Sequence, residues 1–344
     1  MGDRGPGTLV FWQFSSAPCA RSPHAGDTLT LRSPRPRPGR AICLNDSLSL
    51  IPALRMARIQ KPSADFGEAN TVADLLNHIG TWTSKHVSSG SGYHQRVWFR
   101  GHSKRIYELE PGVYRDGFTA RAKSMYGRDL EEKRLNLERE MLGEFRTAGA
   151  TFTDPSNVIS LYFIAQHFGM PTRLLDWTTN PLAALFFAVI DDENEDGDVF
   201  MMDPVQVVEK PKIKGEPIQI VRTMRHPLVA DAIGMSFWHS PKELAEKDPK
   251  EKEAKPVVVK YPRIFAVRPD NEVGRIGQQS SCFTLHTHCS SPVSNASLAR
   301  IKVPAKGKAR IRQELHLLNI NHFTIFNDLD HLSKEVICGW GLSH

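Results

Sequence analysis

Polar and ionisable side chains are concentrated in residues 166–178, directly before an apolar segment. His167 and Asp176 are of the types that transfer protons, and Arg173 and Thr178 are of the types that hold polar ligands. Ionisable groups between buried elements must be paired or used in function. The segment therefore predicts either a catalytic or binding site or an internal Arg173–Asp176 ion pair. Both interpretations stay open from the sequence.

Turn and capping signals predict the elements around these side chains. Gly and Pro within residues 169–171 mark a turn, and residues 172–177 predict a short strand. Thr178 or Asn180 can cap a following helix, and Pro181 suits its first turn. The polar side chains would thus lie at a strand end, where binding residues are often placed.

A second polar strand end is predicted at residues 96–102. Alternation along a strand places Arg100 and Trp98 on one face, and Gly101 would let the backbone turn closely beside Arg100. Arg100 then either stacks on the indole ring or binds a ligand. Trp177 is either a core residue or a residue whose ring covers a ligand. His167 is either a base or a turn residue bonded to a carbonyl.

A third polar segment, residues 275–286, enters another predicted strand and carries Gln278 and Gln279. Side chains that end neighbouring strands meet at one edge of a sheet. We therefore expect both glutamines at the same site as Arg100. Arg100, Arg173, Asp176 and His167 are predicted to converge on one concave pocket.

These segments resemble the FRG domain, a family named for its Phe-Arg-Gly triplet and common in bacteria. The family has no settled biochemical activity, so the resemblance implies a fold and leaves the chemistry open. It covers roughly residues 70–335, and it implies that Glu140 supports a basic site residue. The matching segments are 99–101 (Phe-Arg-Gly), 109–115 (Leu-Glu-Pro-Gly-Val-Tyr-Arg), 140–145, 166–178, 278–286 and 318–330.

The order of the polar strand ends is also similar, at fold level, to the ADP-ribosyltransferase superfamily. There an early strand supplies Arg or His, a middle strand a hydroxyl or Tyr, and a late strand Glu. This resemblance implies NAD as cofactor, with Arg100 on its phosphate or ribose. Gln278 or Gln279 stands at the late position, and an amide cannot act as a general base. Either Asp176 supplies the carboxylate or the site binds without turnover.

Two classes of function remain open. The first is a polar cleft that binds a nucleotide-like small molecule, with ADP-ribosyl transfer as its chemistry. The second is a non-catalytic ligand-binding or regulatory module. A nuclease needs clustered carboxylates for a metal, whereas residues 191–198 have the composition of a solvated turn. His286 and His288 have no third ligand and no cysteine pair has zinc spacing, so no metal site is predicted.

The net charge of +6 is concentrated at the N-terminus. Residues 1–60 hold eight Arg and three Asp, which leaves 36 basic against 35 acidic residues in the rest. The body of the chain therefore lacks a nucleic-acid footprint. Residues 1–60 are predicted to be a disordered or misannotated extension, with translation beginning at Met56; a transit peptide is the alternative. No membrane segment is predicted, the expected location is cytoplasmic, and the sequence names no protein partner.

The remaining pattern predicts one α+β domain, residues 65–340, with a charged surface insertion near 240–256. Its mixed, mostly antiparallel sheet is expected to be flanked by helices, in an arrangement that resembles ADP-ribosyltransferases. Residues 310–318 fit a strand or a short helix. Helices are predicted at residues 71–80, 129–150, 158–167 and 328–337, and further strands at 199–202, 257–259 and 263–268.

Overall fold

The computed structural model describes residues 65–86, 97–154, 156–204, 221–237, 264–269, 280–287 and 298–340. All of these segments lie in one structural unit, Arg55–His344. The predicted extension 1–60, the predicted insertion 240–256, and Gln278 and Gln279 fall outside the described residues. Within the described segments, no helix has both the length and the apolar character that crossing a membrane requires.

Eight strands in these segments form one sheet in the order β1-β8-β4-β2-β3-β7-β6-β5. The strands are β1 (Gly67–Glu68), β2 (Trp98–His102), β3 (Leu174–Thr178), β4 (Gly197–Met202), β5 (Val221–Thr223), β6 (Ile264–Arg268), β7 (Ser281–His286) and β8 (Leu298–Val303). The two outer pairs, β1–β8 and β5–β6, are parallel, and the inner pairs are antiparallel. The predicted α+β class with a mixed, mostly antiparallel sheet is confirmed.

The sheet consists of two four-stranded halves, β1-β8-β4-β2 and β3-β7-β6-β5, which we call its two ladders. The two ladders are joined by a single residue pair between β2 and β3. Every residue of β2 is paired with β4, and every residue of β3 is paired with β7. Between β2 and β3, only Phe99 and Thr178 are paired. The two strands therefore separate beyond this pair, with Arg100 on one side of the unpaired stretch and Asp176 on the other.

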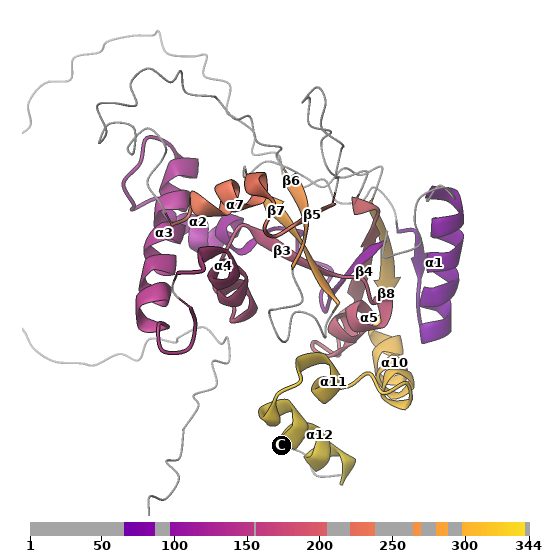
Figure 1. Cartoon of the computed structure of the whole chain (residues 1–344). Coiled ribbons are helices and arrows are strands. Elements are labelled where there is room, and N and C mark those ends of the chain that lie inside the picture. The colour runs from indigo at the N-terminus through magenta and orange to yellow at the C-terminus, as the bar shows by residue number, and fades with distance from the viewer. Residues whose placement is uncertain are drawn as a thin grey trace, which may run out of the picture. The chain divides into compact units, whose positions relative to one another are not determined.

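Two groups of helices cover the same face of the sheet, one over each ladder (Figure 1). The helices are α1 (Val72–His86), the 3-10 helix η1 (Gly112–Tyr114), α2 (Asp116–Ala122), α3 (Leu130–Ala148), α4 (Val158–His167), α5 (Pro181–Val189), α7 (Pro227–Gly234), α10 (Ala305–Leu317), α11 (His322–Phe326) and α12 (Leu329–Gly339). Helices α1, α5, α10 and α11 pack on β2, β4 and β8, whereas α3, α4 and α7 pack on β3, β6 and β7.

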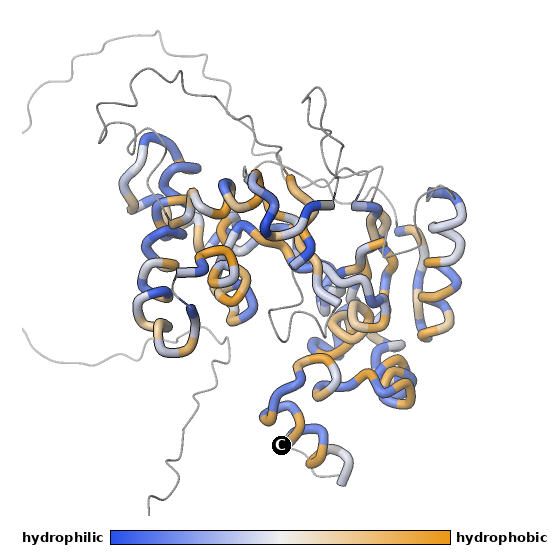
Figure 2. The backbone as a smooth tube through the Cα atoms, in the orientation of Figure 1, coloured by the Kyte–Doolittle hydropathy of each residue, from blue (hydrophilic) through white to orange (hydrophobic). Residues whose placement is uncertain are grey.

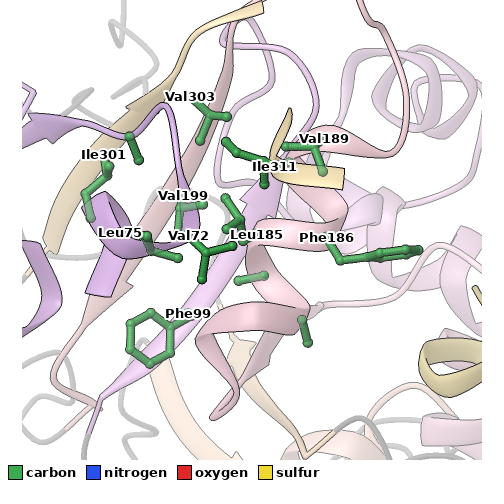
Figure 3. Close-up of a cluster of buried hydrophobic side chains, with 14 of the residues drawn as sticks. Val72, Leu75, Phe99, Leu185, Phe186, Val189, Val199, Ile301, Val303 and Ile311 are labelled. Atoms are coloured by element: carbon green, nitrogen blue, oxygen red, sulfur yellow. The ribbon is translucent and has the colours of Figure 1, made fainter. Parts of the chain in front are cut away.

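Figure 3 shows the first of these cores, where Leu185 of α5 and Val72 of α1 lie among Phe99, Val199 and Ile301 of the strands. Helix α5 is apolar along its length, whereas α3 is largely hydrophilic (Figure 2). The opposite face of the sheet carries a third cluster of buried strand residues. Its members include Trp98, Leu175, Trp177, Phe200 and Cys282.

Helix α5 begins as the sequence predicts. The Asn180 side chain accepts a hydrogen bond from the Leu182 backbone N–H at 3.0 Å, and Pro181 occupies the first turn. The helix then lies against β2 at Gly101, where a Cβ would come within 1.9 Å of the Ala184 carbonyl oxygen. Gly101 is a paired strand residue opposite Val199. The prediction that Gly101 turns the backbone is wrong; Gly101 allows helix and strand to approach.

Some of the predicted helix boundaries are confirmed, and others differ from the structure. Helix α4 spans residues 158–167 as predicted, and α3 begins at Leu130, one residue after its predicted start at Asp129, whose side chain caps the helix. Helix α1 continues past Gly80 to His86, so the predicted end at Gly80 is wrong. Residues 310–318 are helical, within and just after α10.

Asp198 also differs from the sequence prediction. It was expected in the solvated acidic turn, but it is fully buried within β4. Its Oδ1 lies 3.4 Å from Arg105 Nε and 3.8 Å from Arg300 Nε. Buried carboxylates require such charge partners. The carboxylate therefore belongs to the ion-pair structure of the sheet edge.

Lys308 of α10 is fully buried and binds the turns next to β2 and α5. Its Nζ donates to the carbonyl oxygens of Ser103, Asp192 and Asp191 at 2.8, 2.9 and 3.1 Å. Burial lowers the pKa of Lys308, and the charge of Asp192 acts in the opposite direction. The ammonium group thus donates hydrogen bonds to three backbone carbonyl oxygens just after the ends of β2 and α5, where the regular backbone hydrogen bonding stops.

We expect Lys308→Met to lower the free energy of unfolding by about 2–3 kcal/mol, because it leaves these acceptors without a donor. Lys306→Met is the matched control, since Lys306 is exposed two residues earlier on the same helix. Urea unfolding of the two variants measures the difference. Equal stability of both variants would contradict the assigned role of Lys308.

Candidate functional site

Arg100 joins the two ladders of the sheet where β2 and β3 separate. Its NH1 donates to the backbone carbonyl oxygen of Asp176 at 2.7 Å and lies 3.6 Å from Asp176 Oδ2. Its Nε donates to His102 Nε2 at 2.8 Å. Alternation places Arg100 on the face of Trp98 and the Asp176 side chain on the opposite, helix-covered face with Leu174. The guanidinium therefore reaches across the unpaired stretch between the strands.

His102 is a neutral acceptor beneath the guanidinium. Burial, with the added effect of the Arg100 charge, lowers the pKa of His102 to about 3. Because Nε2 accepts from Arg100, the proton must sit on Nδ1, which faces the Tyr107 carbonyl oxygen at 3.3 Å. His102 thus fixes the orientation of the Arg100 side chain by a hydrogen bond, and as a neutral ring it does not neutralise the guanidinium charge.

The Asp176 carboxylate is held from the side of α4. Gln166 Nε2 donates to Asp176 Oδ2 at 2.8 Å, and Thr172 Oγ1 donates to Gln166 Oε1 at 2.5 Å. Between these residues the chain reverses at Gly169, whose φ of +83° lies in the left-handed region that favours glycine. The Met170 N–H then bonds back to the Ala165 carbonyl at 2.9 Å. The chain reversal after α4 therefore brings the Gln166 side chain within hydrogen-bond distance of the Asp176 carboxylate.

A continuous hydrogen-bonded loop encloses the site, and we call it the Arg100 circuit. It runs through the side chains of Arg100, His102, Thr172 and Gln166 and through Asp176, which Arg100 bonds at the backbone carbonyl and Gln166 at the carboxylate. The backbone of residues 107–113 closes it: His102 bonds the Tyr107 carbonyl, and the Val113 N–H donates to the Thr172 carbonyl at 3.3 Å. Two chain segments distant in sequence, residues 100–113 and 166–176, are therefore fixed around one polar centre.

A second positive charge, that of Arg115, acts on Arg100 from outside the circuit. Burial lowers the pKa of Arg100, Asp176 opposes this, and the guanidinium of Arg115 lowers it further. Arg115 is exposed after η1, and its Nε donates to the Glu110 carbonyl oxygen at 3.3 Å. The Asp176 side chain is 51% exposed, so solvent weakens its neutralising effect. Two guanidinium groups that repel each other are an arrangement that an anion stabilises.

Arg173 lies outside this circuit, in a buried network. Its Nε donates to Glu138 Oε2 at 3.0 Å, and its NH2 donates to the Ala232 carbonyl and Ser236 Oγ, both at 2.6 Å. Tyr162 Oη donates to Glu138 Oε1 at 2.5 Å. Burial alone would lower the pKa of Arg173, but the charge of Glu138 outweighs it and raises the pKa.

This network corrects two predictions. Arg173 pairs with Glu138 and Asp176 pairs with Arg100, so the predicted Arg173–Asp176 ion pair is wrong. The buried glutamate that supports a basic residue is Glu138; Glu140 is exposed and accepts a bond from Tyr126 Oη at 3.3 Å. The buried side chain of Arg173 does not join Arg100 and Asp176 in one polar group.

The other predicted site residues support β3 or flank the circuit. Trp177 is 3% exposed, and its Nε1 donates to Thr284 Oγ1 at 3.1 Å, as expected of a core residue. Thr178 is buried, and its Oγ1 accepts from the Asn180 N–H at 3.0 Å. His167 ends α4 half-buried, with its ring 5.3 Å from that of Phe168. In none of these three is a bond to Arg100 or Asp176 found.

Three residues of the site were not singled out from the sequence: His102, Gln166 and Arg115. Strand alternation could have found His102, because it lies two residues after Arg100. Gln166 precedes His167, and the helix end decides which of the two side chains faces Asp176. In the described segments, no group of three or more His, Cys, Asp or Glu side chains could hold a metal ion.

The comparison with protein families finds one matching domain. The model of the FRG domain matches residues 95–197, which include β2 with Arg100 and the whole segment from Gln166 to Asp176. Neither the curated proteins nor the solved structures contain a match to this chain. The Arg100 circuit therefore lies within the region that matches the model of the FRG domain.

Proposed function

We propose that the Arg100 circuit binds a nucleotide-like ligand through its phosphate groups. The observation that carries this proposal is the Arg100 guanidinium, which His102 and Asp176 hold at the junction of the two ladders and on which the charge of Arg115 also acts. A phosphate would relieve their mutual repulsion and accept paired N–H bonds from a planar guanidinium. Arg100 is already oriented by His102 and Asp176, so little side-chain freedom is lost on binding.

Transfer of ADP-ribose from NAD is the chemistry that we propose for this site. NAD supplies a pyrophosphate for the two guanidinium groups and a glycosidic bond that breaks with positive charge developing on the ribose. The half-exposed Asp176 carboxylate, held by Gln166, can stabilise that charge. Arg173 and Trp177 act here as supports: their buried side chains fix the two ends of β3.

A non-catalytic binding module is the second candidate. It is favoured by the engagement of Asp176, which already bonds to Gln166 and lies 3.6 Å from Arg100. A carboxylate held in this way suits recognition of a fixed ligand. The two candidates share the same phosphate contacts and differ only in turnover.

We expect Arg100→Lys to weaken NAD binding about 10–100-fold, since an ammonium group cannot replace a guanidinium bonded at two nitrogens. Calorimetric titration measures the dissociation constant. Arg121→Lys is the matched control, because Arg121 is exposed on α2 and bonds only locally, to Ser124. Thermal unfolding checks that both variants are folded. Absence of heat with NAD at millimolar concentration in the parent protein would end the nucleotide proposal.

Asp176→Asn separates the transferase from the binding module. The amide keeps the size of the side chain and can still bond to Gln166, so NAD binding should change less than threefold. Release of nicotinamide, measured with the parent protein and this variant, should fall to background in the variant. If the parent releases no nicotinamide while binding NAD, the non-catalytic module is the correct alternative.

A further inference from the structure

Tyr107 presents an aromatic ring to solvent next to the Arg100 side chain. The residue is 48% exposed, and its ring lies edge-on to the ring of His102, with the two ring centroids 6.1 Å apart. His102 Nε2 in turn accepts a hydrogen bond from Arg100 Nε at 2.8 Å. A single imidazole ring therefore separates the exposed phenol ring from the guanidinium group.

The backbone holds Tyr107 in this position. Its carbonyl oxygen accepts from His102 Nδ1 at 3.3 Å, and its N–H donates to the Lys104 carbonyl oxygen at 3.3 Å. Two residues later, Leu109 is 3% exposed and packs in the buried cluster of Trp98, on the face of the sheet that carries Arg100. The Tyr107 ring is thus fixed on the Arg100 face before any ligand binds, which lowers the entropic cost of binding.

Exposure of one aromatic ring does not by itself indicate a site, because single exposed apolar side chains are common on protein surfaces. The neighbours of the ring make the difference. Tyr126 is 58% exposed, and its hydroxyl bonds to Glu140 of α3, whereas Tyr107 adjoins an oriented guanidinium. Guanidinium groups hold phosphates and aromatic rings stack on planar bases. A nucleotide carries both groups on one ribose, so it matches this pair of side chains.

We propose that Tyr107 stacks on the base of a nucleotide whose phosphates Arg100 binds. This inference rests on the proposed function and makes the ligand class of the site more specific. The ring favours ligands that carry a planar base over inorganic phosphates and over sugar phosphates without a base. Because every base has a π-face, stacking on Tyr107 selects for the presence of a base and not for its identity.

Calorimetric titrations with ADP and with inorganic pyrophosphate separate the base from the phosphates. Tyr107→Ala should weaken ADP binding about 5–100-fold, the range that base–aromatic stacking gives as a ratio of dissociation constants. Pyrophosphate binding should stay unchanged, because the backbone bond from His102 to the carbonyl of residue 107 remains. Tyr107→Phe keeps the ring and should keep the affinity for ADP. Tyr126→Ala is the matched control, since it makes the same change at another exposed tyrosine.

NMR of the tyrosine ring protons provides a direct test of stacking. The signals of Tyr107 should move upfield on addition of ADP and should not do so with pyrophosphate. Equal ADP affinity in the parent and in Tyr107→Ala overturns the inference but leaves the phosphate site intact. Equal losses of ADP and pyrophosphate binding overturn it too, because the ring would then act only by supporting His102. If neither ligand binds to the parent protein, both the inference and the phosphate site are wrong.

Discussion

Replacing Glu138 with glutamine is expected to lower the free energy of unfolding by about 3–5 kcal/mol, the range for breaking a buried ion pair. The variant keeps the shape of the side chain but leaves the buried Arg173 guanidinium without its counter-charge. Glu138 also accepts from the Tyr162 hydroxyl and the Arg173 backbone N–H, so its loss affects α3, α4 and the start of β3 together. Urea unfolding measures the change.

Glu140→Gln provides the control for this substitution. Glu140 lies two residues later on α3 but is exposed, and within the described residues its side chain accepts only the long bond from Tyr126. Its substitution should change stability by less than about 0.5 kcal/mol, as is usual at a surface position. Similar losses in the two variants would show that Arg173 does not depend on Glu138.

Gly101→Ala is expected to cost about 3 kcal/mol, at the upper end of overpacking effects. The added methyl carbon would lie 1.9 Å from the Ala184 carbonyl oxygen and 2.8 Å from the Ala188 nitrogen, both backbone atoms of α5. Neither atom can move without displacing the helix from β2. Because Arg100 precedes this residue, NAD binding should weaken in the same variant.

Gly143→Ala tests whether the effect belongs to the contact or to glycine itself. Gly143 lies within α3, and a Cβ there would meet no atom within 4 Å. Alanine in a helix is favoured over glycine by about 1 kcal/mol, so this variant should gain stability. If thermal unfolding shows that Gly101→Ala is as stable as the parent, helix α5 does not pack on β2 as described.

Local signals in the sequence were sufficient for the elements next to the site. The apolar run before His167 predicted α4, and Asn180 with Pro181 predicted the start of α5. Alternation predicted β2 and the common face of Trp98 and Arg100. Strand β8 was not predicted, because Arg300 and Lys302 interrupt its apolar pattern. Their partners, Asp65 for Arg300 and Asp196 for Lys302, are distant in sequence.

The division of polar residues between the site and the core depended on tertiary contacts. Arg173 lies just before β3 and bonds to Glu138 of α3, whereas Asp176 lies within β3 and meets Gln166 of α4 and Arg100 of β2. Helix α3 is rich in charged residues, of which Arg134 and Glu138 are buried. Only the packing of α3 on its neighbours decides which glutamate becomes the partner of Arg173.

A structure of the protein with NAD bound tests the central proposal most directly. We predict pyrophosphate oxygens within hydrogen-bond distance of the guanidinium groups of both Arg100 and Arg115, where β2 and β3 separate. The Arg100 bond to His102 should persist, because the neutral ring orients the guanidinium. NAD bound elsewhere on the molecule, with the Arg100–Arg115 pair unoccupied at saturating ligand, would contradict the account.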